Sequence, residues 1–259
     1  FPAQTSERLQ NDIRRLVRIA LERGEQLRGG GPGRYWDDPP IHLLVLPELS
    51  CPRSCLPLLR SWSLKYRMCI AAGLEYEEST DCRLNEMVIF IPVTRNRAGD
   101  CRDLVTLRQR KLFPTGEEMR CAQASGLEVA PGLQQFLIED ADIAAWAVVN
   151  CYDFTCIELR DKLRGATDLL VVSSLNRDTT TFDLLSEASI RDLHSYLLLA
   201  NTGSFGGSQI LGPFYGEHAR CLYKVQGQRL ATCEVREIRI GGERGLRQAQ
   251  IHVMRPGQR

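Results

Sequence analysis

The chain has 259 residues, a length that fits one large domain or two small ones. Hydrophobic residues make up 43% and charged residues 25%, which excludes collagenous, low-complexity and wholly disordered proteins. The 33 Lys and Arg residues balance 32 Asp and Glu residues, so the net charge is +1. This balance argues against a protein that binds nucleic acid or membranes over its whole surface.

The cysteines and the apolar runs restrict the protein class further. The ten cysteines form no paired CxxC motif and no Cys/His spacing typical of zinc sites. No apolar run reaches the ~18 residues that span a bilayer, and no secretory signal is visible. We therefore expect a cytoplasmic protein with mostly reduced thiols, no metal and no membrane contact.

Helical and strand-like patterns alternate along the chain. Residues 5–28 have helical spacing, and the glycine-rich stretch 29–33 ends this predicted helix. The apolar run 41–46 predicts a buried parallel strand that stops at Pro47-Glu48. Further helices are predicted over 57–66, 156–163 and 182–194, and a helix start at Thr115. Further strands are predicted over 67–72, 87–93, 105–111, 133–138, 144–150, 168–173, 196–200, 209–211, 222–225 and 231–238. This order predicts an α/β layered sandwich with no internal domain boundary.

Three residues that could carry chemistry stand at or just beyond the ends of strand-like runs. They are Glu48, Lys111 and Cys151. Taken singly, each has an ordinary structural interpretation: a solvated carboxylate, a surface lysine and a buried inert thiol. Taken together they are more informative, because loops at strand ends hold the functional sites of α/β proteins.

In their order along the chain, these residues resemble a family signature. The segments Leu-Val-Leu-Pro-Glu48-Leu, Arg-Lys111-Leu-Phe-Pro and Asn-Cys151-Tyr-Asp are similar to the Glu–Lys–Cys motifs of the carbon–nitrogen hydrolase family, the nitrilase superfamily. Later segments extend the resemblance over roughly residues 6–240: Leu159 to Leu170, Asn201-x-x-Gly203 and Gly206-Gly207-Ser208-Gln209-Ile210. The resemblance implies a four-layer α-β-β-α sandwich over residues 1–259. Because the first residue is Phe1 and not Met, a fragment of a longer multidomain chain is one interpretation.

The resemblance implies hydrolysis of a non-peptide C–N bond in a small amide, carbamoyl compound or nitrile, without a cofactor. Cys151 would attack as a thiolate, and the ammonium of Lys111 would favour this charged form. Glu48 would take the thiol proton and return it to the leaving amine. The family often adds a second glutamate near the lysine, for which Glu117 and Glu118 are both candidates.

The expected substrate pocket is less clearly defined, with Tyr152, Asn176 and Arg177 as candidates. After Ser174, where the family often has an aromatic residue, the chain has a polar loop that fits either an anionic or strongly polar ligand or a salt-bridged structural turn. The stretch from Asn176 to Thr179 also resembles nitrilase-like domains fused to bacterial defence-associated reverse transcriptases. The alternative function is therefore an assembly or ligand-sensing module of a multidomain antiviral protein, in which only a fused domain would bind nucleic acid.

Family members usually pair through helices, so the resemblance implies a homo-oligomer or contact with another domain of a parent chain. The predicted helices 156–163 and 182–194 are the expected interface. The second helix carries four apolar residues, and the alternative is that they pack on the sheet: Leu184, Leu185, Ile190 and Leu193.

Overall fold

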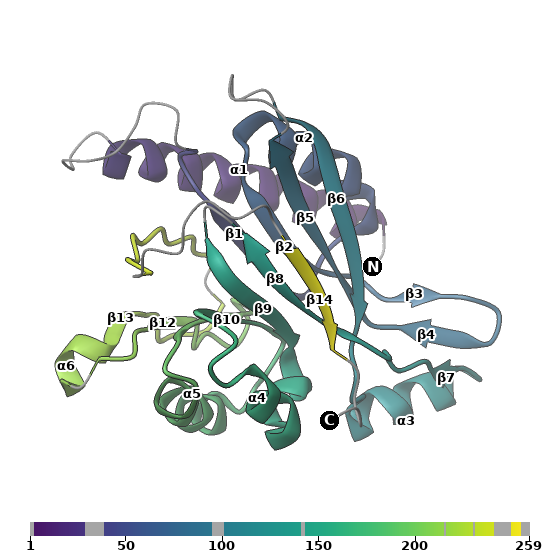
Figure 1. Ribbon diagram of the computed structural model, residues 1–259. Coiled ribbons are helices and arrows are strands. Elements are labelled where there is room, and N and C mark those ends of the chain that lie inside the picture. Colours follow the sequence, from purple (N-terminus) through teal and green to yellow (C-terminus); the bar gives the residue numbers. More distant parts are fainter. Residues whose placement is uncertain are drawn as a thin grey trace.

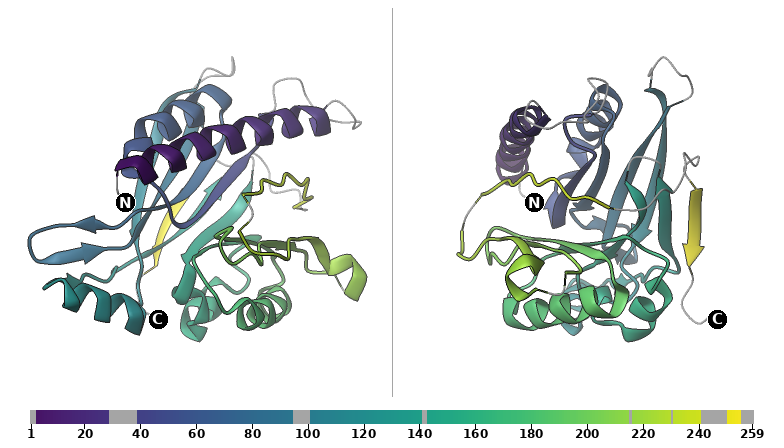
Figure 2. Two further views of the ribbon diagram at one scale, coloured as in Figure 1. Left: turned by 180° about the vertical axis from the view of Figure 1, so that it is seen from behind. Right: turned by 60° about the vertical axis from the view of Figure 1, so that its left-hand side comes forward.

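A computed structural model describes residues 3–28, 39–94, 101–140, 143–214, 216–229, 231–240 and 250–254. Two β-sheets lie face to face, and a helical layer covers the outer face of each (Figures 1 and 2). This arrangement confirms the predicted four-layer α-β-β-α sandwich. The predicted glycine-rich loop at 29–33 lies outside the described residues.

The first sheet has the strand order β1-β2-β5-β6. Its strands are β1 (Leu43–Cys51), β2 (Cys69–Leu74), β5 (Glu86–Thr94) and β6 (Cys101–Arg110). β1 and β2 are parallel, whereas β5 is antiparallel to both β2 and β6. Helices α1 (Ala3–Arg28) and α2 (Leu56–Tyr66) cover its outer face, with the 3-10 turn η1 (Arg53–Cys55) before α2.

The second sheet has the order β13-β12-β11-β10-β9-β8-β14. These strands are β8 (Gln135–Asp140), β9 (Ala144–Asn150), β10 (Leu169–Ser174), β11 (Tyr196–Asn201), β12 (Gln209–Leu211), β13 (Cys221–Lys224) and β14 (Gln250–Met254). The central strands β9, β10 and β11 are parallel. Helices α4 (Ile157–Leu163) and α5 (Thr179–Leu193) cover the outer face, and the 3-10 turn η2 (Cys151–Thr155) precedes α4.

A small third sheet, β3-β4-β7, projects from the first sheet beside helix α3 (Gly116–Ala124) (Figure 1). Its strands are β3 (Glu77–Glu78), β4 (Cys82–Leu84) and β7 (Glu128–Val129), and the short helix α6 (Glu217–Arg220) precedes β13. The sequence patterns do not predict this small sheet, because its strands have two or three residues and half-exposed or exposed side chains.

The central strands are continuous apolar runs because both of their faces are buried. In β9, Trp146 and Val148 face the first sheet, whereas Ala147 and Val149 face α4 and α5. β10 repeats this alternation with Val171 on the inner face and Val172 on the outer face. The period of two therefore lets one strand serve two cores.

Two glutamines form a polar bridge inside the apolar layer between the sheets. Gln109 in β6 and Gln135 in β8 are fully buried and exchange hydrogen bonds through their side-chain amides, at 3.0 and 3.1 Å. Both also donate to the carbonyl oxygen of Val148, from Gln109 at 2.7 Å. These bonds satisfy amide groups that would be costly to bury alone, and they join both sheets.

Three predicted boundaries are wrong for identifiable reasons. β1 does not stop at Pro47-Glu48 but continues to Cys51 past an irregular register, with Leu49 in the left-handed region (φ +54°). The predicted strand 231–238 forms no regular element; Arg23 donates to the carbonyl of Cys233 within it, and Tyr196 donates to that of Arg239 just after it. The helix predicted from residue 182 begins at Thr179, because the Asp178 side chain accepts from the Thr181 amide.

Candidate active site

The carboxyl ends of several strands meet at one edge of the sandwich. Glu48 lies near the carboxyl end of β1, β6 is followed by Lys111, and β9 is followed by Cys151. The Ser173 hydroxyl in β10 donates to the carbonyl of Leu46 in β1 at 3.1 Å, which joins the two sheets near this edge. Residues from both sheets therefore converge on one buried site.

A buried ammonium lies between two carboxylates. Lys111 Nζ is 2.9 Å from Glu48 Oε1 and 2.8 Å from Glu118 Oε2, and Lys111 and Glu48 are 3% and 2% exposed. Glu117, the other predicted candidate, points to solvent. The structure therefore places Glu118, and not Glu117, beside the lysine.

Glu118 also belongs to the start of helix α3. Its Oε2 accepts from the Thr115 amide at 2.8 Å, and the Thr115 hydroxyl accepts from the Glu118 amide. This reciprocal pair is a capping box, which satisfies backbone donors at a helix start. The local sequence of α3 thus fixes the carboxylate that contacts Lys111.

A buried amide that sequence reasoning missed joins both carboxylates. Asn85 Nδ2 donates to Glu48 Oε1 at 2.8 Å and to Glu118 Oε1 at 2.6 Å. Asn150, which precedes Cys151, donates to Asn85 Oδ1 at 3.2 Å. The signal in the sequence is an asparagine directly before the mostly apolar strand β5, but its partners are far away along the chain.

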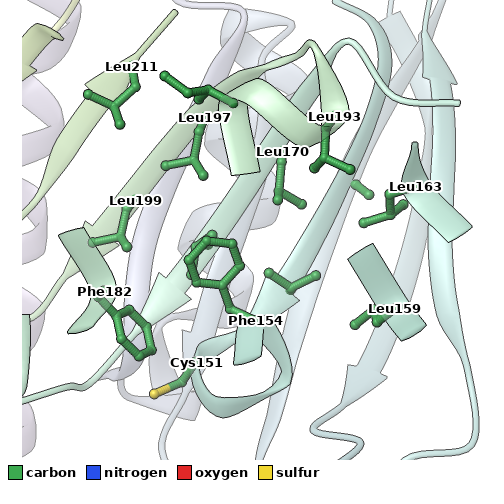
Figure 3. Close-up of a cluster of buried hydrophobic side chains, with 14 of the residues drawn as sticks. Cys151, Phe154, Leu159, Leu163, Leu170, Phe182, Leu193, Leu197, Leu199 and Leu211 are labelled. Carbon is green, nitrogen blue, oxygen red and sulfur yellow. The ribbon is translucent and has the colours of Figure 1, made fainter. Parts of the chain in front are cut away.

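Cys151 begins the turn η2 with a positive φ of +46°. This conformation is uncommon for a side-chain-bearing residue and is concentrated at functional turns. Its Sγ accepts from the Ser174 hydroxyl at 3.6 Å and lies 3.9 Å from the carbonyl oxygen of Leu175. Figure 3 shows Cys151 at the end of the cluster beneath α4 and α5, beside Phe182.

The backbone N–H and carbonyl of Leu175 connect the carboxylate of Glu48 to the thiol of Cys151. Its carbonyl contacts Cys151 Sγ, and its N–H donates to Glu48 Oε2 at 3.0 Å. The Glu48 carboxylate and the Lys111 ammonium are also close enough to act on the pKa of the thiol electrostatically. Glu48, Lys111 and Cys151, which the sequence predicts together, therefore form one cluster with Glu118.

Burial and charge set the protonation of this cluster. Burial, reinforced by the Glu48 carboxylate, raises the pKa of Cys151 to about 12, so the resting side chain is a thiol. Burial alone would lower the pKa of Lys111, but the neighbouring carboxylates and Cys151 raise it above its usual range. Burial opposes ionisation of Glu118 as well, yet Lys111 and several hydrogen-bond donors hold the pKa of this carboxyl below its usual range.

Asp153 supports the backbone around Lys111 from within turn η2. Its carboxylate accepts from the amides of Leu112 (3.0 Å) and Phe113 (2.8 Å), the two residues that follow the lysine. Burial raises the pKa of Asp153 to about 7, although these amides and Lys111 oppose the shift. The turn that presents the thiol therefore also holds the loop that presents the ammonium.

The three predicted pocket residues lie around this cluster and not within it. Tyr152 is largely exposed. The Asn176 side chain bonds to the backbone of Asp178, and the guanidinium of Arg177 stacks over Phe205 with 5.5 Å to the ring centroid. Asp178 caps α5, so these contacts favour the structural interpretation of the polar loop over a built anion site.

A metal cluster or a second cavity would be another candidate centre among the described residues. Within the described ranges, no group of three or more His, Cys, Asp or Glu side chains could hold a metal ion. A cavity of about 1,040 Å³ lies between α1, β1, β11 and the segment 231–240, but Glu48, Lys111 and Cys151 do not line it. Among the described residues, no helix is long and apolar enough to cross a membrane.

Solved structures resemble this chain over most of its length. A mutant of the amidase from Nesterenkonia sp. AN1, with acrylamide added to its active-site cysteine, matches with a TM-score of 0.57 at 17% identity, over 85% of this chain and 84% of that one. The fold is that of the nitrilase superfamily. No family model matches the sequence, and no curated protein matches it.

Two further nitrilase-superfamily structures agree with this assignment. XC1258 from Xanthomonas campestris, a CN-hydrolase superfamily protein with an arsenic adduct in its active site, matches with a TM-score of 0.52 at 11% identity over 92% of this chain and 84% of that one. Nit3 from Saccharomyces cerevisiae, a member of branch 10 of the nitrilase superfamily, matches with a TM-score of 0.51 at 16% identity over 95% and 85%.

Proposed function

We propose that the protein is a cysteine-dependent hydrolase of a non-peptide C–N bond in a small amide, carbamoyl compound or nitrile. The observation that carries this proposal is the buried cluster of Cys151, Glu48, Lys111 and Glu118, in which a thiol, a carboxylate and an ammonium lie together. The amidase with the same fold, whose active-site cysteine forms an adduct, supports it.

The first half of the reaction forms a thioester. The raised pKa of Cys151 means that the thiol needs a base, and Glu48 accepts its proton as sulfur attacks the amide carbonyl carbon. Negative charge develops on the carbonyl oxygen, where the Lys111 ammonium and the Tyr152 N–H stabilise it. The C–N bond then breaks, and Glu48 returns the proton to the leaving amine.

The second half consumes water. Glu48 takes a proton from a water molecule that attacks the thioester carbon, and the carbon–sulfur bond breaks. The acid is released, and the proton returns to the Cys151 sulfur, so the thiol and the carboxylate are restored. Glu118 keeps Lys111 charged and oriented throughout, because it binds the same ammonium as Glu48 does.

Intact mass spectrometry with a panel of amides and nitriles tests this function. The wild-type chain should gain the mass of one acyl group on Cys151, located by peptide mapping, and should release acid. Cys151→Ala should show neither, whereas Cys156→Ala, which removes the thiol directly after the same turn, should behave as wild type. Full turnover by Cys151→Ala would contradict the proposal.

A further inference from the structure

The two loops that follow β10 and β11 are held together by one buried side chain. Asn201, the last residue of β11, lies opposite Ser174, the last residue of β10, and is 6% exposed. Its Oδ1 accepts from the Asn176 amide at 2.9 Å, and its Nδ2 donates to the Asn176 carbonyl at 2.8 Å. The Asn201 side chain therefore binds both backbone groups of the residue that follows Leu175.

The remaining contacts of Asn201 anchor it from the other side. Nδ2 also donates to the carbonyl of Gly206 at 2.6 Å, and the Ser208 hydroxyl bonds to both backbone groups of Asn201, at 3.0 and 3.1 Å. Gly206 has a φ of +74°, and a Cβ there would lie 1.9 Å from the carbonyl oxygen of Gly227. A glycine is required here, because both the conformation and the close approach exclude a side chain.

The Asn201 side chain binds Asn176, one residue after Leu175, whose backbone groups contact Glu48 and Cys151. Leu175 donates its N–H to Glu48 Oε2 at 3.0 Å, and its carbonyl contacts Cys151 Sγ. Asn201 touches none of the reacting groups itself. We propose that Asn201 is a positioning residue that holds the backbone N–H and carbonyl of Leu175 against Glu48 and Cys151.

The expected consequence of losing Asn201 follows from hydrogen bonding to the charged form of Glu48. The Leu175 N–H stabilises the carboxylate, and a displaced loop would remove that donor. The Glu48 carboxylate would then be held less firmly beside the Cys151 thiol, whose proton it accepts. The inference rests on the proposed function, but its readout is the reactivity of Cys151 and not substrate turnover.

Alkylation of Cys151 by iodoacetamide, followed by mass spectrometry between about pH 5 and pH 9, is the test. In Asn201→Ala, alkylation of Cys151 should be roughly tenfold slower at every pH of this range, because the carboxylate that receives the thiol proton is less well positioned. Thr202→Ala is the matched control, since its hydroxyl contacts Ser204 and not the Leu175 loop, and its profile should equal that of wild type.

Hydrogen exchange at the Leu175 amide separates positioning from general destabilisation. Asn201→Ala should lose protection at this amide while the core strands β9 and β10 keep theirs. An unchanged profile together with an unchanged Leu175 exchange rate would overturn the inference. If Asn201→Ala does not fold, Asn201→Ser, which can replace one of the two donated bonds, should shift both readouts in the same direction.

A double-mutant cycle completes the experiment. In a Glu48→Gln background the carboxylate is absent, so Asn201→Ala should change the alkylation profile less than it does in wild type. An equal effect in both backgrounds would show that Asn201 does not act through Glu48. Equal alkylation rates in Glu48→Gln and wild type would contradict the role of Glu48, whereas the Leu175 exchange rate would still decide the role of Asn201.

Discussion

The Glu118 carboxylate serves a helix cap and an ion pair at once. Glu118→Gln can keep one oxygen for both the capping box and Lys111, but it removes the negative charge beside the ammonium and turns an NH2 group toward the Asn85 amide. We expect acyl-adduct formation at Cys151 to fall at least about tenfold, with little change in melting temperature. Adduct formation by mass spectrometry and thermal unfolding measure the two effects.

The exposed neighbour Glu117 offers the matched control for this substitution. Glu117→Gln should alter neither adduct formation nor melting temperature. Thr115→Ala should lower stability by about 1 kcal/mol, because it removes the other half of the cap. Equal adduct formation in Glu118→Gln and wild type would show that Glu118 belongs to the cap alone.

The stability of the fold should depend on pH through Asp153. The pKa of Asp153 rises from 3.8 to about 7 on folding, so between these values the native state binds more protons than the unfolded chain. Stability from this group is therefore present at low pH and is lost as the pH rises through 7. Asp153→Asn removes this titration.

The melting temperature of Asp153→Asn relative to wild type should therefore rise between about pH 5 and about pH 8. Thermal unfolding of both proteins at these two values measures the change. A constant difference would show that Asp153 ionises at its ordinary pKa, held down by the amides of Leu112 and Phe113.

The sequence could predict the positions of Glu48, Lys111 and Cys151, because strand ends and motif order are local features. It could not choose between Glu117 and Glu118, since both fit the first turn of α3 and the choice depends on which face meets Lys111. Asn85 was beyond reach for a similar reason. Its partners Glu48 and Glu118 come from distant parts of the chain.

At the scale of elements, β2 approaches the Glu48 backbone closely at one glycine. A Cβ on Gly73 would lie 2.4 Å from the Glu48 Cα and 2.5 Å from the Pro47 carbonyl oxygen. Because both contacts are with backbone, Gly73→Ala must displace the part of β1 that carries Glu48. We expect a loss of about 1–3 kcal/mol in stability, measured by denaturant unfolding, and slower acylation of Cys151.

Gly116, at the start of α3, provides the comparison for Gly73. A Cβ there meets its nearest neighbour, the tip of the Arg120 side chain, at 3.7 Å, which is ordinary contact. Gly116→Ala should be neutral or slightly stabilising, because alanine is the better helix former. Similar losses in both variants would contradict the steric explanation.

Two sequence predictions failed at the level of whole strands. Residues 231–238 have a strand-like pattern, but the described backbone around this segment bonds to Arg23 and Tyr196 instead of a neighbouring strand. Strand β14 was missed because its pairing partner β8 lies far earlier in the chain. The apolar runs of β9 and β10 were predictable, since burial on both faces leaves a signal in the sequence itself.

For the whole molecule, two apolar side chains on α4 and α5 are largely exposed. Ile157 on α4 is 73% exposed and Leu184 on α5 is 68% exposed, whereas Ile190 and Leu193 pack into the core. The alternative that the apolar residues of α5 pack on the sheet therefore holds for Ile190 and Leu193. Leu185 packs partly against the same core. Association through α4 and α5 stays a prediction that rests on Ile157 and Leu184.

Light scattering tests this association. The wild-type chain should be a dimer at micromolar concentration, and replacing Ile157 and Leu184 by Lys should give monomers, because charged residues do not fit the apolar centre of an interface. Leu133→Lys, at another exposed apolar position, should remain dimeric. A stable interface buries at least about 1,200 Å². A wild-type chain that stays monomeric would contradict the prediction.

The glutamine bridge between the sheets has a consequence for the site. Gln109 lies two residues before Lys111, and its partner carbonyl, that of Val148, lies three residues before Cys151. If β6 or β9 shifted by one residue along its own axis, the buried side-chain amides of Gln109 and Gln135 would face apolar side chains and lose their hydrogen-bond partners. The two glutamines thus fix the position of β6 relative to β9. This relative position sets the distance between the Lys111 ammonium and the Cys151 thiol from within the buried core.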